Sequence, residues 1–541
     1  MTRRGEWKTA AAVSAQLLGF GLVAVPSCHP DSGCEATRSC PPDDGGAGGQ
    51  TDTGGASASD EGQGGEGGQG GAGAGSGGTG TGGNGPCDPA TEQCDAGVIL
   101  HVSPVGSDGD PGSALAPLKT VGEALTRAAT QLGAGEDSVL IYLCTTEGTF
   151  EETLSVSEEH SGIGIYGGFD CGEFAPNSER AVILADDASG HRIQNADTVT
   201  LGDVHLESPD AEGAGQSSYG LTVIESTGVL LVRSEIVAGK GSAGEAGVGY
   251  EGQAGTGKPG DGGKNACAAP PGETNGGGAA SVTTCNTVAT ASIGGKGGPG
   301  GGGDVADGGG AGNPGEPGGG LAGTAACTGG GDGGDGDPGE GGDPSAAIGT
   351  IAAGGYVPPA GGPGTPGEVG KGGGGGGGAA KPTGCETGAS GGSGGGGGCP
   401  GAGAGGGTGG GGSFGLLSVS SDVTLAETSV TVSPGGGGGA GGNGQLGGDG
   451  AAGGGRGLAG GFGSNACDGG NGGNGGPGGS GGGGAGGPSI GVVYIGDAPV
   501  GLDAEDITLP GAGAAGGVGG LDNPDGDASP GKVQPTWDAN L

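Results

Sequence analysis

Apolar and polar residues alternate in three similar stretches of this chain, and each stretch runs into a glycine-rich tract. The stretches are YGLTVIESTGVLLVRSEIVAG from Tyr219, FGLLSVSSDVTLAETSVTVSPG from Phe414 and IGVVYIGDAPVGLDAEDITLPG from Ile490. A period of two is typical of β-strands with one buried face. The shared phase predicts stacked copies of one strand–turn–strand unit, with the glycine-rich tracts extending from the same corner of each copy.

Equivalent positions of these copies carry aliphatic residues, and an upstream stretch, TVTLGDVHLES, continues the same pattern. Side chains repeated in phase on stacked strands would form columns inside a coil, and burying each contributes roughly 1.5 to 3 kcal/mol before entropy. An antiparallel β-sandwich is the alternative, but it does not explain why the copies share one phase. The aligned positions are Val199, Val229, Val423 and Val500; Leu201, Leu231, Leu425 and Leu502; and Leu206, Ile236, Val430 and Ile507.

The segment before these copies predicts a strand at Val98–Val102 and a helix over 120–132, with Val121, Leu125 and Ala128 on one face. Short apolar stretches follow at SVLIYL, TLSVS, GIGIYGGFD and RAVILAD, separated by turn residues. This order resembles right-handed parallel β-helix proteins of the pectin-lyase-like type, in which a strand and an amphipathic helix cap the coil. A cap is required because an open end would expose the apolar interior and unpaired strand edges.

The turn at Gly168–Asp170 resembles one found in secreted proteins of soil bacteria that join a β-helix to glycine tracts. These resemblances imply an all-β fold, a right-handed parallel β-helix with long glycine-rich insertions from one corner, and they imply no activity. The predicted divisions are a signal peptide (1–27), a tether (28–97), a β-helix with its cap helix (98–238), glycine-rich insertions (239–413 and 434–488), single rungs (414–433 and 489–510) and a Gly/Asp/Pro-rich tail (511–541).

Glycine accounts for 162 of the 541 residues, and only 3% are aromatic. From Asp468 the text DGGNGGNGGPGGSGG repeats every three residues, which is the period of an extended, polyproline-II-like helix. Two glycines per triplet permit such helices to pack closely and to bond to one another through backbone groups. Disorder is the alternative, because ordering glycine is entropically costly. The tracts resemble the repeat region of the mycobacterial PE-PGRS surface proteins and, with their cysteines, glycine-rich antifreeze proteins, although the amino-terminal PE-PGRS module and regular rows of threonine are missing.

The amino terminus has the features of an export signal. Arg3, Arg4 and Lys8 precede an apolar run over 10–25, which ends in small residues before Cys28. The sequence VPSC resembles a bacterial lipoprotein box, which implies that Cys28 becomes the acylated first residue. We therefore predict an exported protein of the cell envelope or the extracellular space, held to a membrane only through this lipid.

Cysteine usage points the same way. The chain has 13 cysteines, and those other than Cys28 fall into groups of even number, as expected of disulfides in an exported protein. Proximity suggests the pairs Cys34 with Cys40, Cys87 with Cys94, and Cys144 with Cys171. The connectivity of the remaining cysteines is left open; these are Cys267, Cys285, Cys327, Cys385, Cys399 and Cys467.

The formal net charge is −43, from 60 acidic and 17 basic residues. Such a field repels nucleic acid and anionic membrane surfaces, which excludes them as partners. Asp332, Asp335 and Asp337 lie in a stretch that matches the start of a calcium-binding nonapeptide repeat, without its apolar residue or tandem copies. They are weak candidate Ca²⁺ ligands, and Ca²⁺ is the only candidate cofactor.

One stretch, ADDASGHRI, places Asp186, Asp187, His191 and Arg192 close together. Polygalacturonase-type β-helix enzymes use these residue types, but there they converge from several rungs on one groove, which sets the spacing of acid and base. Here they lie within one turn. We therefore interpret the stretch as a polar loop and assign no catalytic residue.

The sequence favours a non-enzymatic protein of the cell surface or extracellular matrix that acts as a structural or adhesive display platform. Its expected partners are extracellular polysaccharides or other surface proteins. One alternative is a β-helix that binds or cleaves an acidic polysaccharide, which would require a groove with carboxylates from at least two neighbouring rungs. A second alternative is a Ca²⁺-dependent adhesin.

Overall fold

The computed structural model describes Pro89 and residues 97–540, apart from 287–289, 303–314, 317, 326–327, 347 and 462. The chain divides into two compact units, Met1–Gly80 and Thr81–Leu541, and the described residues all belong to the second. The predicted signal peptide, the lipidation site and part of the cysteine set therefore lie outside the described residues; these positions are Cys28, Cys34, Cys40, Cys87, Cys94 and Cys327.

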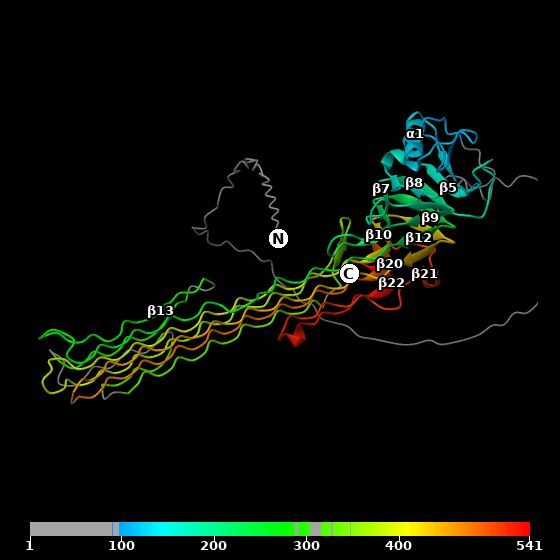
Figure 1. Ribbon diagram of the computed structural model, residues 1–541. Coiled ribbons are helices and arrows are strands. Elements are labelled where there is room, and N and C mark those ends of the chain that lie inside the picture. Colours follow the sequence, from blue (N-terminus) through cyan, green and yellow to red (C-terminus); the bar gives the residue numbers. More distant parts are fainter. Residues whose placement is uncertain are drawn as a thin grey trace, which may run out of the picture. The chain divides into compact units, whose positions relative to one another are not determined.

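Three parallel sheets of six strands form the scaffold (Figure 1). In spatial order, the first sheet contains β1 (Val98–Val102), β2 (Val139–Cys144), β5 (Ile163–Phe169), β8 (Asp197–Gly202), β11 (Thr227–Val232) and β18 (Val423–Ala426). The second contains β4 (Ser155–Val156), β7 (His191–Gln194), β10 (Ser218–Ile224), β17 (Ser413–Val419), β20 (Ser489–Ile495) and β22 (Val533–Asp538). The third contains β3 (Phe150–Glu151), β6 (Ala181–Leu184), β9 (Val204–Glu207), β12 (Glu235–Ala238), β19 (Ser429–Val432) and β21 (Ile507–Thr508).

The chain cycles through the sheets in a fixed order, from the first to the third to the second, as in a right-handed parallel β-helix. Each glycine-rich excursion interrupts this cycle at the same step. The excursions follow β12, β19 and β21 of the third sheet, and the chain returns to β17, β20 and β22 of the second. The prediction of insertions from one corner is confirmed.

The predicted aliphatic columns are present over most of their length. Leu231 pairs in register with Leu201 and Leu425, and all three side chains are fully buried. Val229 pairs likewise with Val199 and Val423. The third column also holds; it is formed by Leu206, Ile236, Val430 and Ile507.

The last member of two columns departs from the prediction. Val500 bridges Thr424 instead of Val423, and its side chain is 55% exposed. Leu502 is only partly buried against the core. A one-residue shift turns a side chain to the opposite face of a strand. Here Gly501 follows with φ of 85°, a left-handed turn that ends the bridge after a single residue.

Corners of the coil repeat one backbone conformation from rung to rung. Between the second and first sheets, Asn195, Glu225 and Ser420 have φ of 56°, 49° and 49°. This left-handed region is uncommon for residues other than glycine, so its recurrence marks a defined turn. The next residue is turned inward, where the Ser226 hydroxyl oxygen accepts a hydrogen bond of 3.2 Å from the Ala196 N–H. Corner hydroxyls thus satisfy backbone donors between rungs.

Helix α1 (Val121–Gly133) covers the beginning of the coil. Its first turn is capped by the Thr120 hydroxyl, which accepts from the Glu123 N–H at 3.1 Å. The Glu152 carboxylate accepts from the Val121 N–H at 2.7 Å, and its negative charge suits this end of the helix dipole. The buried face consists of Val121, Ala124, Leu125 and Ala128, which agrees with the predicted helix.

A hairpin from the first excursion packs on the outer face of the second sheet. It comprises β15 (Thr350–Ala352) and β16 (Gly355–Val357). The Tyr219 hydroxyl oxygen accepts a 2.6 Å hydrogen bond from the Tyr356 N–H, and the Phe414 ring lies against both tyrosines. Burial raises the pKa of Tyr219 and, more strongly, that of Tyr356. The remaining short elements are β13 (Val282–Thr283), β14 (Ser292–Ile293) and the 3₁₀ turns Glu158–His160, Ala504–Asp506 and Pro524–Gly526.

The segment after Pro510 is not a tail. Residues 511–531 form a further glycine-rich excursion, and β22 then adds a strand to β20 in the second sheet. This strand was not predicted from its sequence, VQPTWD, because the sequence has few apolar residues and contains Pro535. Proline cannot donate to a strand ladder and is tolerated on an edge strand, which is the place of β22.

The interpretation of ADDASGHRI as a loop is wrong for its second half, because His191 and Arg192 begin strand β7. The His191 side chain points into the coil and is fully buried. Its Nδ1 accepts a 3.1 Å hydrogen bond from the Leu154 N–H, whereas Nε2 has no partner. Burial lowers the pKa of His191 to about 4. The histidine is therefore a neutral core residue.

We expect His191 to make the fold acid-sensitive. Its pKa in the folded state lies below the ordinary value of 6.5, so the unfolded chain takes up the proton first. Stability is then fully present above pH 6.5 and falls by about 3 kcal/mol as the pH drops to 4. In His191→Asn an oxygen replaces the Nδ1 acceptor and nothing titrates, so urea unfolding should show a shallower loss of stability between pH 6.5 and 4.5. Equal slopes in the wild type and in His191→Asn would contradict the assignment.

Candidate functional site

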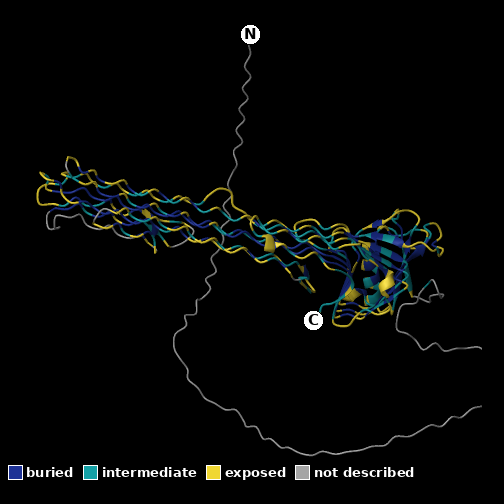
Figure 2. Ribbon diagram, turned by 90° about the horizontal axis from the view of Figure 1, so that it is seen from below, coloured by how far each residue is buried: buried dark blue, intermediate teal, exposed yellow. Residues whose placement is uncertain are grey.

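Backbone hydrogen bonds between neighbouring segments turn the glycine-rich residues into a bundle. Segments 241–266 and 435–459 are joined at every third residue, apart from one extra residue between Tyr250 and Ala254, and three is the period of a polyproline-II-like helix. Examples are the bonds from Gly257 to Asp449, Gly260 to Ala452 and Gly263 to Gly455, at 2.8, 2.9 and 2.8 Å. The ordered alternative is therefore correct for the described glycine-rich residues, and buried residues run along the interior of the bundle as well as inside the coil (Figure 2).

Two inner segments, 388–412 and 466–488, each form backbone hydrogen bonds with six neighbouring segments. Segment 388–412 forms backbone hydrogen bonds with segments 241–266, 275–281, 290–301, 358–379, 435–459 and 466–488. Segment 466–488 forms them with 328–345, 358–379, 388–412, 435–459, 511–520 and 526–531. Each inner segment continues directly into a strand of the second sheet, β17 or β20.

The third residue of each triplet reports whether a neighbouring segment covers it. Along 466–488 this residue is exposed where it is Asp468, Asn471, Asn474 or Pro477, and buried where it is Ser480, Gly483 or Gly486. The buried positions are those that face segments 511–520 and 526–531. A Cβ on Gly483 would overlap the Gly517 carbonyl, and one on Gly486 the Ala514 carbonyl. Side-chain size along the triplets therefore specifies how the segments assemble.

Segment 358–379 follows the same rule. Pro363 and Pro366 are exposed at the third position, whereas Gly372, Gly375 and Gly378 are buried. A Cβ on each of these glycines would overlap a backbone carbonyl of segment 290–301. The sequence thus places bulky residues on the rim of the bundle and glycine at its contacts.

Substitution of an inner glycine should destabilise the bundle strongly. A Cβ on Gly475 would overlap the Cys399 carbonyl, so Gly475→Ala must push two segments apart, at a cost of about 1 to 3 kcal/mol. Gly455 has no neighbouring atom within 4 Å of its Cβ position, and Gly455→Ala should change stability by less than about 1 kcal/mol. Differential scanning calorimetry of both variants checks this. Equal melting temperatures would show that close backbone contact does not limit the bundle.

On the rim of the bundle, polar side chains form hydrogen bonds that a neighbouring segment would otherwise form. The Asn474 side-chain oxygen accepts from the Gly450 N–H at 2.9 Å, and that of Asn471 from the Gly453 N–H at 3.2 Å. Asp335 accepts in turn from the Asn474 N–H at 2.7 Å. These bonds fix the register of adjacent segments.

The candidate Ca²⁺ ligands are not brought together. Asp332 and Asp335 lie one turn apart on segment 328–345, and their carboxylates accept hydrogen bonds from the N–H groups of Asn471 and Asn474, which are likewise three residues apart. Within the described residues, the group of three metal-binding side chains that lies close together is instead Cys144, Glu147 and Cys171. In that group the two sulfurs are bonded to each other.

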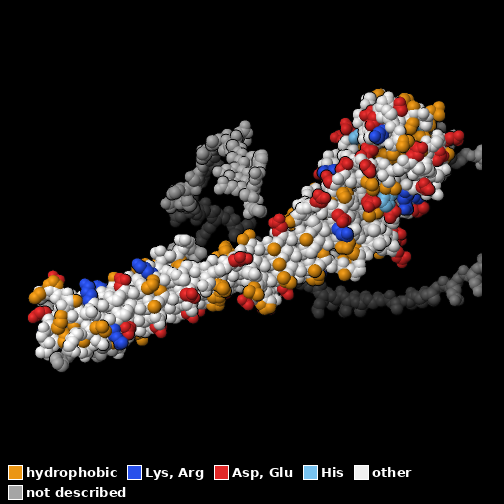
Figure 3. Space-filling model, in the orientation of Figure 1, with side chains coloured by type: hydrophobic (Ala, Val, Ile, Leu, Met, Phe, Trp, Pro, Cys, Tyr) orange, Lys and Arg blue, Asp and Glu red, His pale blue; other side chains and the backbone are white. Residues whose placement is uncertain are grey.

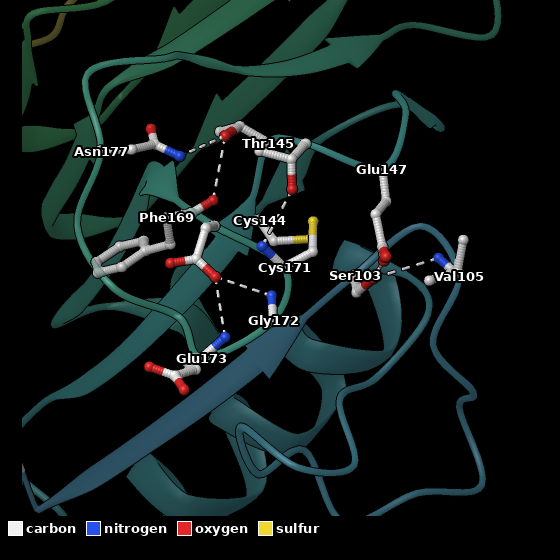
Figure 4. Close-up of a disulfide and its surroundings, with 12 residues drawn as sticks. Ser103, Val105, Cys144, Thr145, Glu147, Phe169, Cys171, Gly172, Glu173 and Asn177 are labelled. Carbon is white, nitrogen blue, oxygen red and sulfur yellow. Dashed lines mark hydrogen bonds between the residues drawn. A yellow bond between two sulfur atoms is a disulfide. The ribbon is translucent and has the colours of Figure 1, made fainter.

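Disulfides join segments that are distant in sequence. Cys144 is bonded to Cys171, as their proximity suggested, and the link holds the turn that contains Asp170 (Figure 4). The Asp170 carboxylate accepts 2.9 Å bonds from the N–H groups of Glu173 and Gly172, which lower its pKa. In the bundle, Cys267 is bonded to Cys385 and Cys285 to Cys399, and Cys467 is also disulfide-bonded.

A groove of about 810 Å³ lies on the outer surface of the β-helix, at the corner between the first and third sheets. Asp203, Arg233 and Glu427 occupy this corner in successive rungs, with φ of 52°, 49° and 51°. Arg233 donates to both carboxylate oxygens of Asp203, at 2.9 and 2.6 Å. Glu235 also lines the groove. Carboxylates from neighbouring rungs therefore meet at one groove.

The groove also contains a chain of polar contacts centred on Glu235. This carboxylate lies 3.2 Å from Nη1 of Arg180 and 3.1 Å from Nδ1 of His205. The other ring nitrogen of His205 lies 3.3 Å from the Glu207 carboxylate. Both nitrogens of the histidine are thus engaged. Figure 3 shows acidic and basic side chains interspersed over the β-helix, whereas the surface of the bundle is mainly backbone and uncharged polar residues with scattered charged and hydrophobic side chains. The groove offers charged, hydrogen-bonding groups to a ligand.

The residues singled out in the sequence lie elsewhere. Asp186 and Asp187 line a separate cavity of about 730 Å³, bounded by Tyr219 and Tyr356 beside the β15–β16 hairpin. Sequence reasoning missed the groove because its charged partners are distant along the chain. The available signal was the rung period, since Asp203 pairs with Arg233, and His205 with Glu235, at a separation of 30 residues.

No known family model and no curated protein matches this chain. Among solved structures, a rhamnogalacturonan lyase is similar to part of it, with 12% sequence identity and a TM-score of 0.18. The match covers 26% of this chain and 36% of that chain. The fold assignment rests on strand order and register. In the part of the chain that the structure describes, no helix has the length and apolar character needed to cross a membrane.

Proposed function

We propose that this protein is an exported, non-catalytic structural protein of the cell surface or extracellular matrix. The observation that carries the proposal is the bundle, whose two inner segments are each hydrogen-bonded to six neighbouring segments and enter the β-helix as strands β17 and β20. A stiff element of this kind suits display or spacing. Disulfides between distant segments and the export features of the first 28 residues support an extracellular location.

Surface labelling of intact cells that produce the full chain tests this proposal. A membrane-impermeant amine reagent should modify exposed bundle lysines, such as Lys258 and Lys264, to the same extent before and after lysis. In the isolated protein, the cysteines assigned to the described disulfides should not react with a thiol reagent. Labelling only after lysis, together with free thiols, would refute an extracellular role. Mass spectrometry of the mature amino terminus tests the lipid anchor, which requires an acylated Cys28.

A second candidate function is binding or cleavage of an acidic polysaccharide at the corner groove. The observation that favours it is the convergence of Asp203, Glu235 and Glu427 from neighbouring rungs, with Arg180 beside them. Affinity electrophoresis in a gel containing polygalacturonate would detect binding as retardation. Arg180→Gln should abolish the retardation, and Lys264→Gln on the bundle should not. Chain shortening of the polysaccharide would establish a catalytic role and overturn the non-catalytic proposal.

A further inference from the structure

Segment 511–520 covers only part of the inner segment 466–488. Its Gly517 and Gly520 N–H groups donate to the Gly484 and Gly481 carbonyls, at 2.8 and 2.9 Å. Segment 511–520 then ends, whereas segments 435–459 and 328–345 continue to be bonded to 466–488 as far as residues 469 and 468. Among the described residues, no other segment takes its place over 468–477.

The N–H groups of segment 435–459 that are bonded to segment 511–520 are followed by N–H groups with other partners where segment 511–520 ends. Gly438 and Gly441 donate to the Ala515 and Val518 carbonyls, at 2.9 and 2.8 Å. Beyond this point the equivalent donors of segment 435–459 are bonded to side chains of segment 466–488. These bonds join Gly444 to Ser480, Gly450 to Asn474, Gly453 to Asn471 and Arg456 to Asp468, at 3.1, 2.9, 3.2 and 2.8 Å.

We infer that Asp468, Asn471 and Asn474 prevent a glycine-rich segment of a second copy of this chain from adding to the bundle. Unpaired backbone groups on an edge are a template for association, and proteins protect such edges with side chains. The occupant that the position would accept is defined by segment 511–520, which fills its continuation in the same molecule. The three side chains extend from the uncovered side of segment 466–488, and they accept the hydrogen bonds of the segment 435–459 N–H groups that an added segment would need. This inference concerns the bundle alone and does not depend on the proposed surface role.

The test uses the full chain with the double substitution Asn471→Gly/Asn474→Gly, which leaves the net charge unchanged. Sedimentation velocity should show self-association with a dissociation constant at least tenfold lower than that of the wild type. A fluorescent peptide with the sequence of residues 511–521 should bind the variant and not the wild type. The matched control is Thr256→Gly, an exposed residue of segment 241–266 whose side chain forms no hydrogen bond in the described residues. The control should behave as the wild type.

A variant that keeps its circular dichroism spectrum, remains monomeric and does not bind the peptide would overturn the inference, as would equal association of the Thr256→Gly control. If the double glycine variant does not fold, Asn471→Ser/Asn474→Ser decides. Ser480 shows that serine at this position accepts from Gly444 and still donates to the Leu521 carbonyl of the covering segment. The serine variant should therefore fold and bind the peptide, and failure to bind it would equally overturn the inference.

Discussion

Leu231→Asp should uncouple the stacked rungs of the β-helix. The Leu231 side chain is fully buried between Leu201 and Leu425 in the middle of an aliphatic column. Loss of a buried leucine costs about 2 to 5 kcal/mol, and an unpaired carboxylate in the same place adds its desolvation penalty. We expect destabilisation of at least about 4 kcal/mol, measured by urea unfolding followed by circular dichroism.

The adjacent position supplies the control. Leu230 is partly exposed on the outer face of β11, between Thr200 and Thr424. Leu230→Asp has the same change of chemistry but leaves the columns intact, so its effect should stay within about 1 kcal/mol. If both variants lose stability equally, the columns do not hold the coil together.

Removal of the Cys285–Cys399 disulfide should destabilise the bundle strongly. The two residues are separated by 114 positions, and a loop of that length corresponds to about 4 to 5 kcal/mol in the chain-entropy model. Cys144 and Cys171 are separated by 27 positions, for which the same model gives about 3 to 4 kcal/mol. Calorimetry of Cys285→Ser/Cys399→Ser should show the larger fall in melting temperature, with the β-helix pair Cys144→Ser/Cys171→Ser as comparison. An unchanged melting temperature of the bundle variant would mean that the backbone hydrogen bonds alone fix the segments.

The periodic parts of the fold could be predicted from the sequence, because each period has one physical meaning. A period of two located most strands and their common corner, and the triplet from Asp468 indicated three-residue helices. Strands β7 and β22 were missed. His191 is polar but buried, and Pro535 lies in a strand only because that strand is at an edge.

The charged groove could not be predicted from short stretches of the sequence for a different reason. Its partners come together only after one full turn of the coil, so Arg233 and Asp203 are neighbours in space and 30 residues apart in sequence. The disulfide pairing in the bundle could not be predicted for a similar reason. Cys285 and Cys399 lie on separate segments, and the register of these segments depends on the whole hydrogen-bond pattern. The size of the third residue in each triplet does depend on whether a neighbouring segment covers it. This relation could be recognised only once the neighbours of Gly483 and Asn474 were known from the structure.

The way in which the two inner segments enter the coil determines how the molecule bears mechanical load. Segments 388–412 and 466–488 continue without interruption into β17 and β20, which are neighbouring parallel strands of one sheet. Tension on the bundle therefore pulls both strands in the same direction along their length. Their hydrogen bonds to each other and to β10 and β22 are loaded in parallel as shear, so no single bond has to break first. At the corner from which the bundle extends, force therefore enters the β-helix as shear along its strands and does not peel one rung from the next.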